Sequence, residues 1–343
     1  QGPNFTNEAY QYVNRVPNLQ VLSAESTLTS DDGLEQLKNM DSLVALLLRR
    51  TEVTDEGLKS LKALPKLKDL DVRFTNVGDS GMESIAEIPS LRYLKLQQTL
   101  ISESGVETLT KLENLERLNL NNLFIGNPAL EQIQKFKKLT HLDLDDTQID
   151  DAGLEHLKDL RTLKHLSFSR DFITETGLAH LAGLTNMEEL NLRQIGTTDD
   201  GMVSLKDMKK LRMLDLSETI IGDPGVEHLT ALASLEGLDL WATNVTDKST
   251  ESLGKLTNLK DLSLEATKIT DEGLKNLTTL KNLEKLNLTK TAITAEGLAN
   301  LQELPKLKEV VVGFTGITDE QRQAFNKNRD KEKPQVQFTE TAR

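Results

Sequence analysis

The chain has 343 residues, a formal net charge of −13 and no cysteine, so disulfides and thiolate metal sites are excluded. Only 37% of the residues are hydrophobic and 4% are aromatic, which predicts a thin core made mainly of leucine. The acidic charge disfavours nucleic acid and anionic membrane as partners. No run of about 18 apolar residues occurs, so we expect no membrane-spanning helix.

The chain opens with two short segments. Residues 1–3, Gln-Gly-Pro, resemble the remnant of a cleaved purification tag and are left out of the fold prediction. Residues 4–18 are predicted to form an N-terminal capping half repeat, with a short helix whose apolar stripe is Tyr10, Val13 and Val16. No signal peptide precedes them. Because the chain starts inside a half repeat, further N-terminal repeats, an effector domain and an export signal all stay open.

From residue 19 to residue 325 one pattern recurs thirteen times, every 24 residues. Its first position is held by Leu19, Leu43, Leu67, Leu91, Leu115, Leu139, Leu163, Met187, Leu211, Leu235, Leu259, Leu283 and Leu307. Apolar residues three and five places later complete L-x-x-L-x-L, and Thr stands eight places after the first position in most repeats. Ile or Val, then Thr-Asp-x-Gly-Leu, and then two more apolar residues at three-residue steps finish the repeat.

Each segment of the repeat has a physical interpretation. The L-x-L alternation predicts a short strand with one buried face. Thr-Asp supplies N-cap oxygens, and the spaced leucines that follow give a short helix one apolar stripe. We interpret the Gly as allowing close approach between neighbouring repeats. Since one strand and one short helix cannot bury their own apolar faces, the repeats are predicted to stack.

The pattern resembles the leucine-rich-repeat family, with Thr in place of the usual Asn or Cys. The form L-x-x-L-x-L-x-x-T-x-I-T-D-x-G-L is similar to that of a large group of bacterial leucine-rich-repeat proteins. The resemblance implies an α/β solenoid, a curved horseshoe with parallel strands on the concave face and short helices on the convex face. The helices need about 10 Å of lateral room and the strands only about 4.8 Å, which also predicts this curvature.

Residues 326–343 are predicted to be a C-terminal cap and tail. A helix starts at Thr318-Asp319 and runs through Phe325, and a charged run follows it. Residues 334–338 are interpreted as a short closing strand with Val336 and Phe338 inward.

The candidate binding surface is the concave face. Exposed strand residues stand two, four and six places after the first position, and the seventh lies at the rim. Basic residues gather in repeats two to five and acidic residues in repeats nine to eleven, so we interpret the face as polarised. The predicted partner-contact residues are Arg49, Arg73, Tyr93, Lys95, Arg117, His141, Asp143, His165, Arg193, Asp215, Asp239, Trp241, Asp261 and Glu265.

Two features of this face have alternative interpretations. Trp241, the only tryptophan, is either a contact anchor or an indole that folds over a neighbouring repeat. His141 and His165 occupy the same position in adjacent repeats beside Asp143, a set that could ligate a transition metal. Their spacing matches no metal motif, so we interpret them as a solvated polar patch and predict no metal.

The Thr column is interrupted in the middle of the array. Leu123, Asp171 and Ile195 stand where Thr is regular, and Asn127 replaces the usual Asp. Such exceptions are either functional or the result of neutral drift in a tolerant array.

The sequence favours a non-catalytic protein-binding scaffold over two other classes. The alternative is recognition of a glycan or small anion by the basic strip of Arg49, Arg73, Tyr93, Lys95 and Arg117. A third class, an enzyme, lacks support because no G-x-S-x-G, P-loop, H-E-x-x-H or G-x-G-x-x-G motif is present. We expect a protein partner, no cofactor and a monomer.

Overall fold

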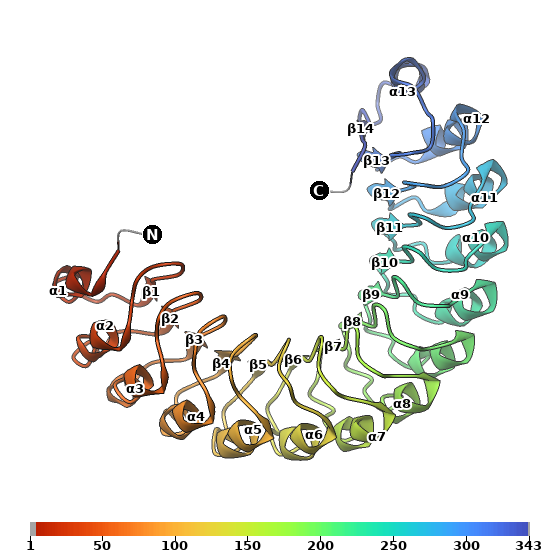
Figure 1. Cartoon of the computed structure of the whole chain (residues 1–343). Coiled ribbons are helices and arrows are strands. Elements are labelled where there is room, and N and C mark those ends of the chain that lie inside the picture. The colour runs from red at the N-terminus through yellow and green to blue at the C-terminus, as the bar shows by residue number, and fades with distance from the viewer. Residues whose placement is uncertain (1–4, 342–343) are drawn as a thin grey trace. The chain divides into compact units, whose positions relative to one another are not determined.

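The computed structural model describes residues 5–341 and divides into two units, Gln1–Asp171 and Phe172–Arg343. The tag-like residues 1–3 lie outside the described residues. In each unit short strands and short helices alternate along the chain, with the strands on one side and the helices on the other (Figure 1). This is the predicted solenoid arrangement of one strand and one helical segment per repeat.

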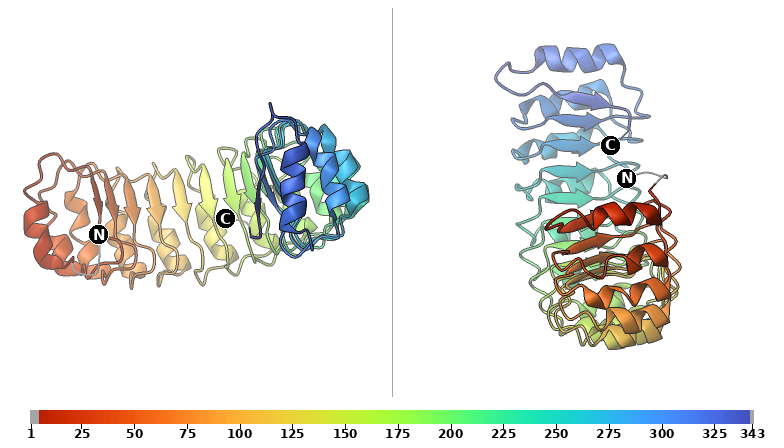
Figure 2. Two further views of the ribbon diagram at one scale, coloured as in Figure 1. Left: turned by 90° about the horizontal axis from the view of Figure 1, so that it is seen from above. Right: turned by 90° about the vertical axis from the view of Figure 1, so that its left-hand side faces the viewer.

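The strands of the N-terminal unit pair in chain order and in parallel (Figure 2). Each residue pairs with the residue 24 positions later, as Leu46 does with Leu70. The strands are β1 (Val21–Ser23), β2 (Ala45–Leu47), β3 (Asp69–Asp71), β4 (Tyr93–Lys95), β5 (Arg117–Asn119), β6 (His141–Asp143) and β7 (His165–Ser167). Its helices are η1 (Asn7–Ala9), α1 (Tyr10–Val13), α2 (Asp31–Glu35), α3 (Asp55–Leu58), η2 (Leu61–Ala63), α4 (Asp79–Ile85), α5 (Glu103–Leu109), α6 (Asn127–Ile133), α7 (Asp151–Leu154) and η3 (Glu155–Leu157).

The C-terminal unit repeats this arrangement. Its parallel strands are β8 (Glu189–Asn191), β9 (Met213–Asp215), β10 (Gly237–Asp239), β11 (Asp261–Ser263), β12 (Lys285–Asn287), β13 (Glu309–Val311) and β14 (Gln337–Thr339). Its helices are α8 (Glu175–His180), η4 (Asp199–Leu205), α9 (Asp223–Leu229), α10 (Asp247–Leu253), α11 (Asp271–Asn276), η5 (Leu277–Thr279), α12 (Ala295–Ala299), η6 (Asn300–Glu303) and α13 (Asp319–Asn328).

The core of each unit consists of the repeated leucines. In the repeat that starts at Leu259, the strand residues Leu262 and Leu264 are fully buried, as are Leu274 and Leu277 of the helical segment. Each core layer is therefore one repeat thick and is closed by the layers on either side. Burying a leucine side chain contributes about 2 kcal/mol, so the stacked leucines supply the main driving force for folding.

A hydrogen-bonded link joins the helix start of one repeat to the helix start of the next. Asp247 accepts from the backbone N–H of Thr270 at 2.8 Å and from its hydroxyl at 2.6 Å. A Cβ on Gly273 would lie 2.5 Å from the Asp247 Oδ1 atom, so only glycine leaves room for this carboxylate. The predicted role of the Gly is confirmed. The Asp, by contrast, caps the next repeat rather than its own helix.

The regular geometry of the repeat is kept at Asn127, which replaces the usual Asp. Its Oδ1 atom accepts from the backbone N–H of Asp150 at 3.1 Å, so the amide oxygen replaces the carboxylate in the link. The Thr column also has a structural role that its position alone did not reveal. The Thr267 hydroxyl, for example, donates to the carbonyl oxygen of Leu264 at 2.6 Å and fixes the turn after the strand.

The N-terminal half repeat differs in part from the prediction. Tyr10 is fully buried, and its ring packs edge-on against Phe5 at 5.4 Å. Val16 lies beyond the helix, which ends at Val13, and its side chain is 48% exposed. The predicted apolar stripe therefore loses its last member, because the chain turns away from the helix axis before it reaches Val16.

The C-terminal cap extends further than predicted. Helix α13 continues to Asn328, and the closing strand β14 starts at Gln337. Val336 is buried, and Phe338 is half-buried with its ring edge-on to Phe325 at 5.4 Å. The buried side chain of Arg329 fastens this cap through hydrogen bonds to backbone carbonyl oxygens.

Candidate functional site

The backbone of each repeat determines which side chains leave the core. In β3, Leu70 is fully buried while Asp69 and Asp71 flank it on the other face of the strand. Seven places after the first position, the backbone of each repeat is left-handed although none of these residues is glycine; Arg50 has φ of 55° and Phe74 has φ of 57°. This turn presents the residue before it and the left-handed residue at the rim of the strand face. We call this surface the strand face of each unit.

In the N-terminal unit, two arginines enclose one aromatic ring at this rim. The guanidinium carbon of Arg49 lies 5.1 Å from the centroid of the Phe74 ring, and that of Arg50 lies 5.0 Å from it. The Arg49 Nε atom is buried and has no hydrogen-bond partner. We call these three residues the Phe74 cluster.

A second pair lies at the start of β4 and β5. The guanidinium carbon of Arg117 lies 5.2 Å from the centroid of the Tyr93 ring, and the two residues are paired across the strands. Arg117 is exposed and Tyr93 is half-buried. We call this pair the Tyr93 cluster. Cation–π contacts of this kind contribute about 0.5–1 kcal/mol at exposed sites and hold the guanidinium flat on the ring.

Between the two clusters, the predicted basic strip is neutralised. Arg73 binds the Asp71 carboxylate through Nε at 2.9 Å and through a terminal nitrogen at 2.6 Å, and Lys95 lies 4.0 Å from the same carboxylate. Burial raises the pKa of Asp69, which stands on the same strand. Two members of the predicted basic strip, Arg73 and Lys95, are therefore paired with a carboxylate that the sequence analysis did not include.

The predicted histidine pair is present in the N-terminal unit. The rings of His141 and His165 stack at 5.6 Å with an interplanar angle of 18°, and His165 Nε2 lies 2.7 Å from Asp143 Oδ1. Asp143 also accepts from the side-chain amide of Asn119 at 3.0 Å. Across residues 5–341, no group of three or more His, Asp or Glu side chains is placed to hold a metal ion. The pair forms part of a polar network on the strand face.

In the C-terminal unit, Trp241 is part of a three-residue cluster. The guanidinium carbon of Arg193 lies 4.9 Å from the Trp241 ring centroid, and Arg193 Nε donates to Glu218 at 2.8 Å. Ser217 lies between them in the same column and is almost fully buried, so its small side chain lets Arg193 reach across one repeat. The structure places Trp241 against a neighbour, and its half-buried indole still forms part of the strand face.

The predicted acidic residues of the C-terminal unit lie beside this cluster. Asp215 and Asp239 are paired across neighbouring strands, and each accepts a backbone N–H from the residue two places on. Burial raises the pKa of Asp239 and that of Asp261. Glu265 accepts from the Asn287 amide at 2.9 Å. These carboxylates lie on or just after neighbouring strands, and Lys285 faces Asp261 across the next pair of strands.

The sequence analysis missed one column of strongly exposed apolar side chains. Nine places after the first position, Leu100 is 68% exposed and Phe124 is 84% exposed in the N-terminal unit. In the C-terminal unit, Phe172 is 65% exposed and Ile220 is 60% exposed at the same position. A bulky apolar residue at a position that is polar or small in most other repeats was the available signal. Exposed aromatics of this kind often mark contact surfaces.

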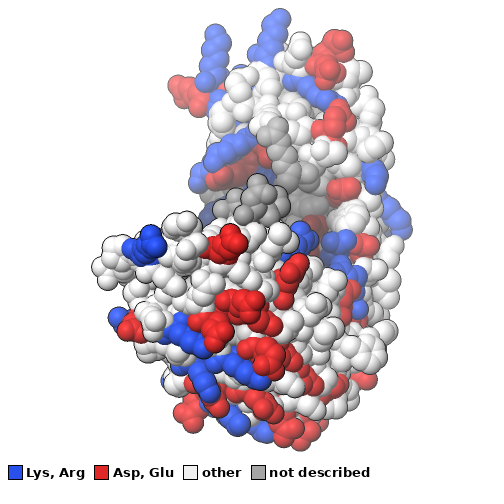
Figure 3. Space-filling model, turned by 60° about the vertical axis from the view of Figure 1, so that its left-hand side comes forward, with Lys and Arg blue, Asp and Glu red and all other residues white. Residues whose placement is uncertain are grey.

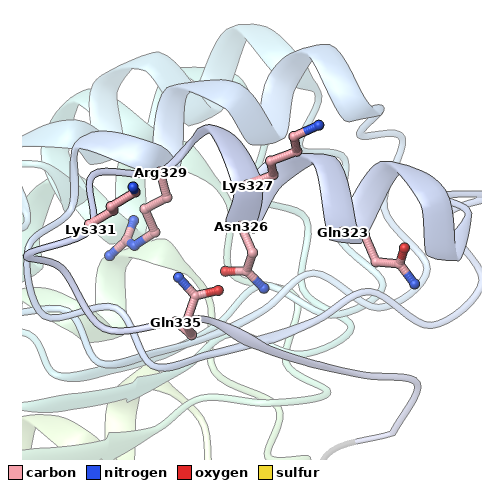
Figure 4. Close-up of a pocket in the computed structure, with 6 residues that line it drawn as sticks. All are labelled: Gln323, Asn326, Lys327, Arg329, Lys331 and Gln335. Atoms are coloured by element: carbon pink, nitrogen blue, oxygen red, sulfur yellow. The ribbon is translucent and has the colours of Figure 1, made fainter.

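Two other surfaces are weaker candidates for a binding site. On the face drawn in Figure 3, basic and acidic side chains are interspersed without one large patch of a single sign. A wide hollow of about 570 Å³ lies at the C-terminal cap, lined by Gln323, Asn326, Lys327, Arg329, Lys331 and Gln335 (Figure 4). The Arg329 guanidinium donates its hydrogen bonds to backbone carbonyl oxygens there.

None of the helices in residues 5–341 has the length and apolar character that crossing a bilayer requires.

Comparisons with known proteins agree with the repeat geometry. Residues 63–86, 137–158, 255–277 and 279–301 each match a family model described as leucine rich repeat. The chain contains leucine-rich repeats and has the solenoid fold that such repeats form. Similar solved structures of this leucine-rich-repeat fold include an internalin (inlF) from Listeria monocytogenes, at 22% identity and a TM-score of 0.64 over 89% of this chain and 93% of that one. A TDR receptor structure matches at 16% identity and a TM-score of 0.60, over 99% of this chain and 67% of the receptor chain. No curated protein matches this leucine-rich-repeat chain.

Proposed function

We propose that this leucine-rich-repeat protein is a non-catalytic recognition module that binds a protein partner through the strand face. The observation that carries the proposal is the pairing of arginine with an exposed or half-buried aromatic on that face, in Arg117 with Tyr93 and in Arg193 with Trp241. Tyr, Trp and Arg are the residues that most often dominate protein-binding surfaces. Each ring is already held by its neighbour, so little side-chain entropy is lost on binding.

The uniform repeat length also favours binding over catalysis. Thirteen repeats of 24 residues leave no inserted loop to cover the strand face and exclude water from it. Efficient catalysis uses a preorganised, water-excluding pocket. A receptor is among the structures that share the fold, which supports the same class of function.

The alternative of glycan or small-anion recognition loses part of its basis. It relies on five residues, and two of them, Arg73 and Lys95, are held by Asp71. We therefore do not propose it as the function.

Affinity capture from the source organism's lysate and secreted fraction tests the proposal. The baits are the wild type, Arg117→Glu, Trp241→Ala and the control Lys66→Glu, which changes an exposed residue away from the strand face. Circular dichroism melts confirm that each bait is folded. We expect one protein to be retained by the wild type and the control and lost with at least one strand-face variant. Equal retention by all four baits would place binding on another surface.

A further inference from the structure

The N-terminal unit carries free cationic charge at two separate places on its strand face. Among the ion pairs of residues 5–341, none involves Arg49, Arg50 or Arg117, whereas Arg73, Arg92 and Arg170 each pair with a carboxylate. The Arg49 Nε atom is buried without a hydrogen-bond acceptor. Since the guanidinium groups of Arg49, Arg50 and Arg117 have no carboxylate partner within the described residues, their charges are available to an external acceptor.

The two clusters lie diagonally across one part of the strand face. Arg49 follows β2 and Arg117 opens β5, three strands further along. Strands about 4.8 Å apart give a lateral separation of roughly 14 Å, and four residues at about 3.3 Å each give roughly 13 Å along the strand. The diagonal is therefore about 20 Å, which an extended peptide spans in about six residues.

The surface between the clusters offers no unpaired cation to a further negative charge. Asp71 is bound by Arg73 and approached by Lys95, and Asp69 lies beside it. The half-buried Leu47 adds apolar surface next to these residues. A ligand with evenly spaced negative charges would place some of them over these paired groups and beside Asp69, and a neutral or apolar stretch would not.

We propose that this unit binds an extended acidic peptide segment whose two acidic positions are about six residues apart and are separated by uncharged residues. One carboxylate binds Arg49 and Arg50 beside Phe74, and the other binds Arg117 beside Tyr93. The rings hold the guanidinium groups flat, which prepares them for two parallel hydrogen bonds to a carboxylate. This inference rests on the proposed function, since it names the partner chemistry of the same strand face.

The test is fluorescence anisotropy with labelled synthetic peptides at low salt. Each peptide has one Glu near each end, separated by about two, five or eight uncharged residues, which brackets the expected spacing. A fourth peptide replaces both Glu residues with Gln, and a sulfated glycan serves as a competitor. We expect the five-residue spacer to bind best, with affinity about tenfold above the other spacers and the Gln peptide.

Variants of the protein separate specific from general charge effects. Arg49→Ser, Arg50→Ser and Arg117→Ser should each weaken binding of the best peptide by about tenfold, as expected for loss of one charge-assisted contact. Arg50 is exposed, so Arg50→Ser stays informative if Arg49→Ser fails to fold. Lys66→Ser removes the same charge from an exposed turn and should leave binding unchanged.

Each of the following results would overturn the inference. Equal binding at all spacings, or equal weakening by Lys66→Ser, would mean general charge attraction. Tighter binding of the sulfated glycan would assign the clusters to a polyanion. Absence of peptide binding together with a dimer that Arg117→Ser dissociates would assign them to a second copy. If Trp241→Ala still abolishes capture of a protein partner while no peptide binds, the proposed function stands and this inference fails.

Discussion

Asp171 is the most unusual residue of the Thr column. Its carboxyl group is buried, and its Oδ1 atom accepts from the backbone N–H of Thr147 at 2.8 Å and from the Thr147 hydroxyl at 2.9 Å. The Oδ2 atom has no hydrogen-bond partner. Burial is the main cause that raises the pKa of Asp171 to about 7, and the nearby carboxylates of Asp145 and Asp146 add to it.

We expect Asp171 to make the protein less stable as the pH rises from about 4 to about 7. The folded state holds this proton more tightly than the unfolded chain, so the stabilisation is complete below the unfolded pKa and is lost as the pH rises through the folded pKa. Asp171→Thr and Asp171→Asn should both raise the free energy of unfolding at pH 8 by about 2 kcal/mol and flatten its pH dependence. Urea unfolding at about pH 4.5, 6 and 8, which bracket the folded pKa of Asp171 of about 7, measures the free energy of unfolding. An unchanged pH slope in both variants would contradict it.

The left-handed turn residues give a second prediction at the same scale. Ala242 is exposed and has φ of 54°, a conformation that costs an L-residue other than Gly, Asn or Asp about 1–2 kcal/mol. Ala242→Asn should therefore stabilise the protein by about 0.5–1 kcal/mol. Ala233→Asn, at an exposed site that is not left-handed, is the control. Thermal unfolding followed by circular dichroism compares them, and an equal gain in both variants would remove the backbone explanation.

At the scale of the helical elements, the close approach at the helix starts is testable in a single repeat. A Cβ on Gly225 would lie 2.5 Å from Asp199 Oδ1 and 2.6 Å from a methyl carbon of Ile221. Gly225→Ala should destabilise the protein by about 2 kcal/mol through overpacking. Gly222→Ala is a matched control three residues earlier, where the nearest atom to the new Cβ would be 3.8 Å away. Similar unfolding midpoints for the two variants would contradict the steric argument.

The C-terminal cap depends on the buried side chain of Arg329. Its guanidinium donates to the carbonyl oxygens of Leu301, Gln302, Leu304, Leu307 and Pro334. Arg329→Met keeps the apolar stem and leaves these acceptors without a donor, at a cost of about 2–3 kcal/mol. We expect faster amide hydrogen exchange in η6 and β14 of the variant, while Lys327→Met, an exposed change, should not alter it. Unchanged exchange in Arg329→Met would show that the cap is held by other contacts.

The elements were largely predictable because each is a local pattern. The L-x-L alternation located the strands, and the repeated Gly predicted close approach between helix starts. The target of the Asp was not predictable, since an Asp after Thr looks like a helix cap and its hydrogen bond goes to the next repeat. The length of α13 was underestimated because Asn326 to Asn328 continue the helix without apolar residues.

At the scale of the whole molecule, the solenoid fold followed from periodicity, and the binding surface did not. Columns of charged residues can be read from the sequence, but ion pairs depend on which column faces which. Arg73 and Arg117 are both basic residues at exposed strand-face positions in the sequence, yet one is held by Asp71 and the other is stacked on Tyr93. Exposed Phe124 went unnoticed because its loop position was not assigned to a surface.

The net charge of −13 gives a prediction for the whole chain. Exposed ion pairs such as Lys59 with Glu56 contribute little to stability, whereas like charges repel throughout the molecule. Raising the NaCl concentration from about 20 mM to about 500 mM should therefore raise the melting midpoint by a few degrees, because it screens this repulsion. A lower midpoint at high salt would mean that the ion pairs outweigh the repulsion.

The links between helix starts also determine how such a chain can change its length. Each link joins two residues that are 23 positions apart, as Asp31 to Thr54 and Asp223 to Thr246 do. Duplicating or deleting one complete 24-residue segment inside the array joins an Asp to a new Thr at the same separation and leaves every link intact. An insertion of any other length changes the separation between the Asp and the Thr that flank it. We expect it to break the link between these two residues and to displace the leucine layer that contains it. Growth and shortening by whole repeats are therefore the changes in length that the architecture tolerates at least cost, and they would add or remove a complete row of strand-face side chains each time.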